Sequence, residues 1–248
     1  MSTAFVLRPT MLATVAHEIR NPLTALQATS EILDREFDLL ENNQKRALIA
    51  ELRTRVLSLR GLTDNLLSAA AIGEGRLSIA PRPLDVRQAI GDALGLLAPV
   101  MSKRGQRVRV RIGRIPLAMA DERRIGQVLV NLLSNASKYA DAGTKIDVSA
   151  SAAPGRVRVG IADRGPGVPR ALARRLFEPY ERAGRTDGDG YGIGLSITRA
   201  IIDAHHGRIG VVSRPGGGAR FWFEIPATDM ATDLDSEQPD ENYLRDVG

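Results

Sequence analysis

The stretch AHEIRNPLTAL, residues 16–26, decides how the first part of this chain folds. Apolar residues recur through and beyond it at spacings of three, four and seven: Leu12, Val15, Ile19, Leu23, Leu26, Leu33, Phe37 and Leu40. That spacing predicts a long amphipathic helix with coiled-coil character. If Leu12 takes heptad position a, His17 falls at position f, so we expect its imidazole to face solvent.

His17 has neighbours that a nucleophilic histidine would use. Asn21 follows at i+4 and shares its helix face. Pro22 lacks an N–H, so it frees the carbonyl of Glu18 and should bend the helix beside the histidine. An imidazole with a pKa of about 6.5 is largely neutral at pH 7, and Glu18 can hold one ring nitrogen protonated while the other attacks. Taken alone, these features are equally compatible with an ordinary solvated helix face.

The composition is that of a globular chain. It has 248 residues, of which 43% are hydrophobic and 25% charged, and it contains no cysteine, which excludes disulfides and thiolate metal sites. No apolar run approaches the roughly 20 residues that span a bilayer, and no signal-peptide pattern opens the sequence. We therefore expect a soluble, cytoplasmic chain without a membrane segment.

The formal charge of +5 conceals an asymmetry along the chain. Residues 229–248 contain seven acids and one arginine, a net charge of −6, so the preceding 228 residues carry +11. The basic residues are scattered and only 4% of residues are aromatic, so no nucleic-acid partner is expected. Phosphate-bearing ligands or an acidic protein partner explain the excess as well.

Two long helices are expected to open the chain, one over about residues 10–40 and one carrying apolar residues from Ile49 to Ala70. The polar residues Glu41–Asn43 predict a turn between them, which makes residues 1–75 an antiparallel helical hairpin. A single hairpin leaves half of each apolar stripe uncovered, so we expect a homodimer that forms a four-helix bundle. A monomeric hairpin packed against the rest of the chain is the alternative.

Residues 76–83 are rich in proline and predict a linker, residues 84–228 predict a second domain, and the acidic tail of residues 229–248 is expected to be disordered. Helices are predicted at about residues 85–104, 122–139 and 196–205, and strands at residues 107–112, 118–120, 145–150, 156–162, 208–213 and 219–225. Strand hairpins mixed with helices predict an α+β two-layer sandwich. The predicted fold class is thus multidomain: an all-α hairpin followed by this sandwich.

Three stretches of the second domain carry groups suited to a nucleotide. Asn131, Asn135 and Lys138 lie on one face of the helix at residues 122–139, where an asparagine oxygen suits Mg²⁺ and a lysine suits phosphate; a solvated face is the alternative. The sequence DRGPGVP, residues 163–169, places a carboxylate and two glycines directly after a strand. The sequence GDGYGIGLS, residues 188–196, opens a helix, where backbone N–H groups and the helix dipole form an anion cradle.

Six motifs in this order resemble the bacterial sensor histidine kinases of two-component systems: AHEIRNPLTAL, NLLSNASKY, DRGPGVP, FEPYER, GYGIGLS and HHGRIGVVSRPGGGARFWFEIP. The hairpin resembles their dimerisation and histidine-phosphotransfer domain. The second domain resembles the ATP-binding fold shared with gyrase-type, MutL-type and heat-shock ATPases. The resemblance implies an ATP- and Mg²⁺-dependent kinase that phosphorylates its own His17 and passes the phosphoryl group to an aspartate of a response regulator.

The resemblance also implies a role for each matching residue. His17 would be the phosphoacceptor, Glu18 its base, and Asn21 would orient a water when the regulator is dephosphorylated. Asn135 would bind Mg²⁺, and Arg182 would belong to the transfer geometry. The residues implied to contact the nucleotide are Asn131, Asn135, Lys138, Tyr139, Asp163, Gly165, Gly167, Phe177, Gly190, Gly192, Gly194 and Leu195.

Other interpretations stay open. Tyr191 stands where the glycine-rich motif of this family usually has Thr or Ser, which favours a non-catalytic, dimeric ATP-sensing scaffold as the alternative. An ATPase of the gyrase or heat-shock group would leave AHEIRNPLTAL unexplained. We expect the input to come from an upstream sensor domain or a separate sensor protein. His205 and His206 lack neighbouring acids or thiols and are interpreted as structural.

Overall fold

A computed structural model describes residues 9–179, 192–214 and 216–228; the side chains of residues 9–15, 17 and 18 are not described. The chain divides into two compact units. One comprises Met1–Ser78 and Val168–Ala204, and the other Ile79–Gly167 and His205–Gly248. The predicted hairpin lies in the first unit and the predicted sheet in the second. The division into domains at residues 75 and 84 stays a prediction.

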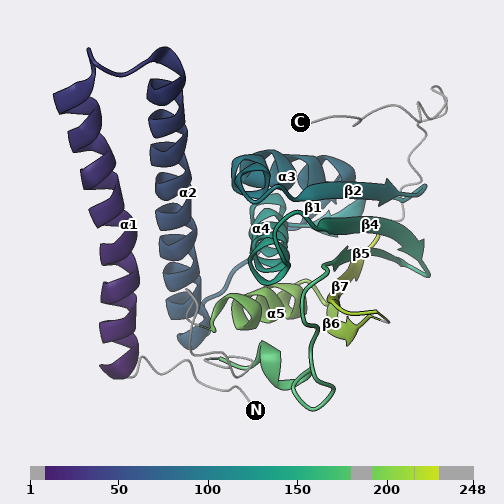
Figure 1. The fold of residues 1–248 in the computed structure, drawn as a ribbon. Helices are drawn as coiled ribbons and strands as arrows, with labels where there is room; N and C mark the ends of the chain where they lie inside the picture. Colours follow the sequence, from purple (N-terminus) through teal and green to yellow (C-terminus); the bar gives the residue numbers. More distant parts are fainter. Residues whose placement is uncertain (1–8, 180–191, 215, 229–248) are drawn as a thin grey trace. The chain divides into compact units, whose positions relative to one another are not determined.

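The first unit contains the predicted helical hairpin, made of α1 (Pro9–Glu36) and α2 (Asn42–Gly73) (Figure 1). The first helix ends four residues earlier than expected, because the backbone N–H groups of Leu39 and Leu40 both donate to the Glu36 carbonyl and close a turn. Glu41 is the N-cap of α2, and its N–H donates to Gln44 Oε1 at 2.8 Å. This reciprocal cap moves the turn to residues 37–41 and leaves Asn42 inside the helix.

Two further elements belong to the first unit, η1 (Arg175–Phe177) and α5 (Gly194–Ala204). The helix α5 contacts both α2 and η1. Its side chains Ile197, Ile201 and Ile202 are fully buried. The sequence predicted α5 two residues too late, and it did not predict the single turn η1.

The second unit is built on a five-stranded sheet in the order β2-β4-β5-β7-β6. Its strands are β2 (Arg107–Ile112), β4 (Lys145–Ala153), β5 (Arg156–Ala162), β6 (Arg208–Ser213) and β7 (Ala219–Pro226). The pair β2–β4 is parallel and the other three pairs are antiparallel. Two helices, α3 (Val86–Lys103) and α4 (Glu122–Tyr139), pack on each other and on one face of the sheet (Figure 1). A helical hairpin followed by a two-layer sandwich is the predicted fold class.

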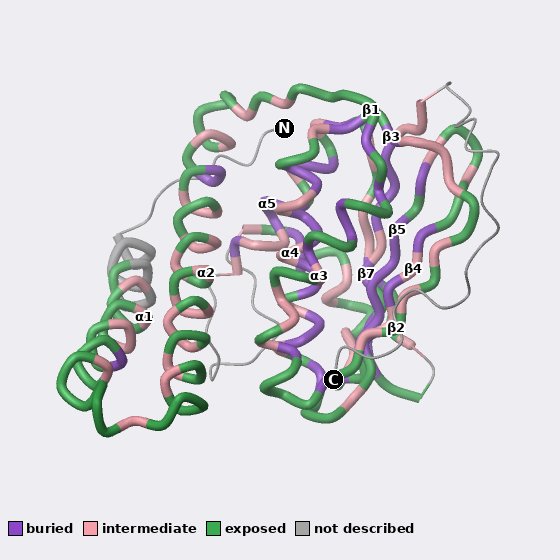
Figure 2. Tube along the Cα trace, turned by 90° about the horizontal axis from the view of Figure 1, so that it is seen from above, coloured by how far each residue is buried: buried purple, intermediate pink, exposed green. Residues whose placement is uncertain are grey.

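The core of this unit lies between α4 and the sheet, and Figure 2 shows purple stretches on α4, β5 and β7. The largest fully buried side chains here are Ile90, Ile125, Leu129, Leu132, Leu133, Ile146, Ile161 and Phe223. They alternate along the strands and recur at helical spacing on α4, as a sheet with one covered face requires.

One strand was not predicted. β1 (Arg82–Leu84) pairs antiparallel with β3 (Ala118–Ala120), with Pro83 opposite Met119. The sequence analysis assigned Arg82 and Pro83 to a linker, because prolines disfavour interior strands. Proline is tolerated where a strand has only one neighbour, since the missing N–H can face away from it.

None of the described helices combines the length and apolar character needed to cross a membrane.

Candidate functional site

The polar stripe predicted on α4 is present and lies beside a buried apolar face. Ile125, Val128, Leu129, Leu132, Leu133 and Ala136 are at most 1% exposed. Asn131, Asn135 and Lys138 are only half-buried. Tyr139, at the end of the helix, is 44% exposed, and Lys138 Nζ lies 5.6 Å from the centroid of its ring. The buried apolar face thus fixes the side of α4 on which two amides, an ammonium group and an aromatic ring are placed.

The start of α4 is fixed by Asp121, which caps it. Asp121 Oδ1 accepts from the Arg124 N–H at 3.1 Å, and Oδ2 accepts from the Ala80 N–H at 3.0 Å. Burial raises the pKa of Asp121, but these two hydrogen bonds and the charge of Arg123 outweigh it and hold the pKa below its usual value. The Asp121 N–H donates to Nε2 of His205, which is 2% exposed. His205 therefore has the structural role predicted for it.

Asp163 is a buried carboxylate at the end of β5. Its side chain accepts two backbone hydrogen bonds, from Gly165 at 2.9 Å and from Ala219 at 3.0 Å, and both reach Oδ1. The residue is 4% exposed, and its Oδ2 accepts no hydrogen bond from the residues that the structure describes. The fold therefore orients this carboxylate through one oxygen and leaves the other available to a ligand donor.

The loop after Asp163 is held against α4 so closely that side chains do not fit. A Cβ atom on Gly165 would overlap the Tyr139 carbonyl, and one on Gly218 would overlap the Asp163 carbonyl. Gly218 also has a φ of +92°, a region that favours glycine. Gly167 has a φ of +80°. The structure thus brings Asp163, Gly165 and the end of α4 together, and their contact with a nucleotide stays a prediction.

A group of residues that supports Asp163 was missed by sequence reasoning. Arg214 Nη1 donates to the Asp163 carbonyl oxygen at 2.8 Å, and the Asp163 N–H donates to the Ala219 carbonyl at 2.9 Å. These contacts come from the turn RPGGGAR, residues 214–220. The triple glycine was the available signal, because consecutive glycines indicate a close backbone approach.

Arg214 also belongs to an arginine cluster around Asp147. Arg109 Nη2 lies 2.6 Å from Asp147 Oδ1, while Arg164 and Arg214 approach Oδ2 at 3.3 and 3.6 Å. Burial raises the pKa of Asp147, but the hydrogen bond from Arg109 and the charges of all three guanidinium groups lower it below the usual range. Asp147 therefore stays ionised and ties the Arg164 loop to the sheet.

The remaining predicted nucleotide contacts lie in the first unit. Gly192 has a φ of +65°, and Gly194 is the first residue of α5. Phe177 in η1 is 5% exposed, and Leu195 is half-buried. Gly190, Arg182 and Tyr191 lie outside the described residues.

The candidate phosphoacceptor lies in α1. His17 and Glu18 have helical backbone, and their side chains lie outside the described part of the chain. Asn21, one turn after His17, is exposed, and Pro22 lies inside the helix as predicted. The predicted heptad position of the imidazole thus stays a prediction.

The chain joins a helical hairpin to a sheet-and-helix layer with an oriented acidic group and an amide-bearing helix, and the family matches define its class as histidine protein kinases. Residues 120–229 match the family described as histidine kinase-, DNA gyrase B- and HSP90-like ATPase. Residues 8–75 match the His Kinase A (phospho-acceptor) domain.

Individual relatives agree with these family matches. The adaptive-response sensory kinase SasA of Synechocystis is 35% identical over 223 residues, 87% of this chain and 58% of the relative. The full-length structure of ShkA in complex with AMPPNP has a TM-score of 0.63 at 31% identity, over 91% of this chain and 47% of that one. The catalytic domain of histidine kinase ThkA has a TM-score of 0.54 at 31% identity, over 61% of this chain and 97% of that one. ThkA in complex with response regulator TrrA has a TM-score of 0.58 at 27% identity, over 89% of this chain and 62% of that one.

The chain belongs to the two-component sensor histidine kinases and has the two characteristic domains of that family. The resemblance inferred from the six motifs is thereby confirmed. The chain spans a little over half the length of the SasA relative that it matches.

Proposed function

We propose that this chain is an ATP-dependent protein histidine kinase that phosphorylates His17 and passes the phosphoryl group to an aspartate of a response regulator. The observation that carries the proposal is the Asp163 carboxylate, buried, oriented through Oδ1 and without a described partner at Oδ2. Oδ2 is not among the described buried atoms that lack a partner, so a ligand donor can reach it. The exocyclic amino group of adenine is such a donor, and Gly165 fixes the loop beside it, because the backbone of Tyr139 fills the space that a side chain at position 165 would need.

The polar stripe of α4 fits the phosphate end of the same nucleotide. Asn135 would hold a magnesium ion, with Asn131 beside it and Lys138 near phosphate charge. The described residues contain no group of three or more His, Asp or Glu that could hold a metal ion, so an ion at Asn135 would need other oxygen ligands. Phosphate oxygens and waters are the ligands that Mg²⁺ usually keeps in such sites. A bound magnesium ion would neutralise charge on the phosphates during transfer.

The transfer needs a nucleophile, a base and groups that stabilise the negative charge on the phosphate oxygens. A neutral His17 nitrogen attacks the γ-phosphorus of ATP, the bond from that phosphorus to the bridging oxygen breaks, and ADP leaves. Glu18 holds the proton on the other ring nitrogen and so stabilises the imidazolium that forms. Gly192, Gly194 and Leu195 at the start of α5, together with Gly190, would bind the triphosphate through backbone N–H groups. Tyr139 and Phe177 are proposed to lie near the nucleotide, and Arg182 is proposed to belong to the transfer geometry.

The proposed partners follow from the same family. ThkA was solved in complex with the response regulator TrrA, which supports a receiver domain as the phosphoryl acceptor here. The exposed Asn21 is proposed to orient a water in the reverse reaction. A homodimer through the hairpin is proposed because α2 leaves Ile49, Val56 and Leu67 at 48, 53 and 70% exposure.

Labelling with γ-³²P-ATP and Mg²⁺ tests the proposal sharply, because the chain has only three histidines. We expect an acid-labile label on the native chain, none on His17→Gln, and full label on His206→Asn, because asparagine suits the left-handed backbone at position 206.

Asp163→Asn should weaken nucleotide binding about 10- to 100-fold, the value of one hydrogen bond to a charged group. The amide oxygen of the new side chain can still accept from Gly165 and Ala219.

The other outcomes contradict parts of this proposal. Label that persists on His17→Gln would show that another residue is the nucleophile. Nucleotide binding without label on the native chain would favour the non-catalytic scaffold. Unchanged affinity in Asp163→Asn would remove the adenine assignment.

A further inference from the structure

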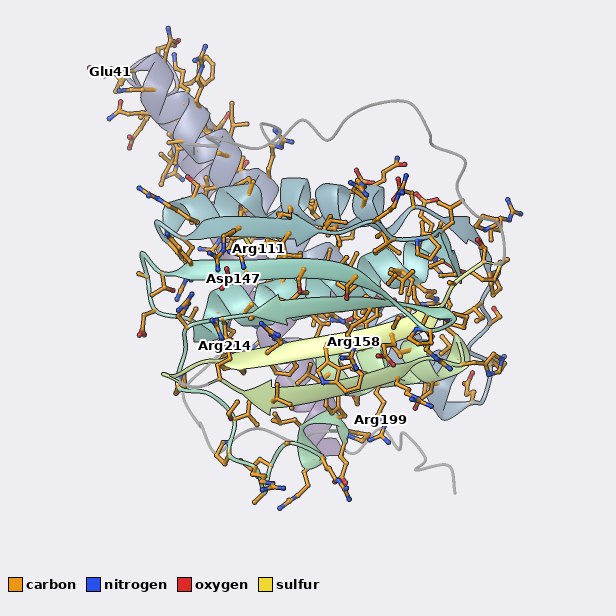
Figure 3. All side chains as sticks on the ribbon, turned by 90° about the vertical axis from the view of Figure 1, so that its right-hand side faces the viewer. Glu41, Arg111, Asp147, Arg158, Arg199 and Arg214 are labelled. Atoms are coloured by element: carbon orange, nitrogen blue, oxygen red, sulfur yellow. The ribbon has the colours of Figure 1, made fainter. Side chains whose placement is uncertain are left out.

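The face of the sheet opposite α3 and α4 is strongly basic. Strand alternation and register place eight basic residues on it: Arg107, Arg109, Arg111, Lys145, Arg156, Arg158, Arg208 and Arg220. Only two acids, Asp147 and Glu224, share this face. Figure 3 looks onto it, with Arg111, Asp147 and Arg158 labelled. We call these ten residues and Trp222 the basic sheet face.

Both acids of this face are already paired. Asp147 is held by Arg109, and Glu224 Oε1 lies 2.7 Å from Arg158 Nη2. Arg107, Arg111, Lys145, Arg208 and Arg220 make no ion pair with any residue that the structure describes. The face therefore carries an excess of about six positive charges, and most of them lack a local counter-charge.

An aromatic ring, Trp222, lies over a glycine, Gly210, on the β7 and β6 side of this face. Trp222 lies between Gly160 on β5 and Gly210 on β6 in the register of the sheet. A Cβ atom on Gly210 would come within 2.7 Å of the Trp222 ring, so the ring occupies the space that a side chain would take. The Arg158 guanidinium lies 4.7 Å from the centroid of the ring. An extended segment with carboxylates and a few apolar side chains would match such a surface.

We propose that the basic sheet face binds the acidic C-terminal segment of this same chain, residues 229–248. That segment has a net charge of −6, which matches the excess on the face. It also carries five apolar residues that can reach the ring: Met230, Leu234, Tyr243, Leu244 and Val247.

The segment starts at the edge of the face that it is proposed to cover. Ala227 N–H donates to the Gly155 carbonyl at 3.0 Å, and Thr228 N–H to the Leu117 carbonyl at 2.8 Å. Pro226 is opposite Arg156 in the register. Twenty residues can extend up to about 65 Å, whereas five strands spaced by about 4.8 Å are only about 20 Å wide. Because the segment is tethered, its effective concentration exceeds that of a free acidic partner.

The test uses the only tryptophan of the chain, Trp222, as a probe on the face. Acrylamide quenching of Trp222 is measured on the full chain and on a full chain in which the seven acids of the segment are changed to Asn or Gln. At about 20 mM NaCl we expect quenching to rise at least about twofold when the acids are neutralised. At about 1 M NaCl the quenching of Trp222 should be equal in the two chains, because the Debye length falls to about 3 Å.

A matched pair of variants locates the surface. Arg111→Gln/Arg208→Gln/Arg220→Gln removes three charges of the face and should raise quenching as the neutral segment does. Arg46→Gln/Arg53→Gln/Arg60→Gln removes three exposed charges of α2 and should leave quenching at the native value.

Three results would overturn the proposal. Equal quenching of the native and neutralised chains at low salt would show that the segment does not cover Trp222. Protection that grows with protein concentration would assign the face to the segment of a second copy. Protection that appears only on adding polyaspartate would assign the face to an external acidic partner.

Discussion

Gly218 shows how little space surrounds Asp163. Its φ of +92° and the overlap of a Cβ with the Asp163 carbonyl both disfavour a side chain at this position. We expect Gly218→Ala to lower the free energy of unfolding by about 1–3 kcal/mol. Urea unfolding followed by the fluorescence of Trp222 measures this change in the free energy of unfolding, since Trp222 lies in the same sheet.

Gly126 on α4 is the matched control for this substitution. No atom lies within 4 Å of a Cβ built there, and helix-interior Gly→Ala gains about 0.5–1 kcal/mol. Gly126→Ala should therefore stabilise the chain. Equal effects at both positions would contradict the close approach inferred at Gly218.

At the scale of one element, the Asp121 cap of α4 should contribute to stability in a pH-dependent way. The folded-state pKa of Asp121 is lowered, so its contribution to stability is present above its unfolded pKa of about 3.9 and is lost as pH falls through the folded value. Asp121→Ala should cost about 1 kcal/mol at neutral pH, and the difference from the native chain should shrink below about pH 4. Urea unfolding between about pH 3 and pH 7 measures this difference.

Asp121→Asn separates the charge from the hydrogen bond. Its amide oxygen can still accept from the Arg124 N–H, but it does not titrate in this range. We therefore expect it to retain part of the cap energy at neutral pH without the acid-dependent loss at this position. A difference between native and Ala chains that stays constant down to pH 3 would show that the carboxylate of Asp121 is not the titrating group.

At the scale of the whole molecule, the exposed stripe of α2 predicts self-association. Ile49, Val56 and Leu67 are spaced by 7 and 11 residues, which at about 100° per residue places them within about 20° of one direction. Light scattering should give about twice the chain mass of 26.8 kDa. Val56→Glu should produce monomers, because a dimer would have to bury the new charge.

Ser58→Glu is the control for dimer formation. Ser58 is exposed and lies about 200° from Val56 around the helix axis, so its substitution should leave the mass unchanged. A native chain that is monomeric at all concentrations tested would favour the alternative of a monomeric hairpin.

The sequence alone determined most elements of this protein. The strands at residues 107–112, 118–120, 156–162 and 208–213 and the helix at residues 122–139 have the predicted bounds. Local signals were sufficient because each has a clear period, and several have a cap or turn at their ends, such as the Asp121 cap or the turn at Pro154–Gly155. The family was likewise readable, since six motifs in fixed order carry it.

Only the tertiary structure decided how the site is supported and where the charge excess lies. The hydrogen bond from Ala219 to Asp163 joins residues 56 positions apart, and β1 depends on pairing with a strand over thirty residues away. The arginines that appear scattered in the sequence come from strands that the register places side by side. Such contacts are set by strand pairing over long sequence separations, which no local pattern encodes.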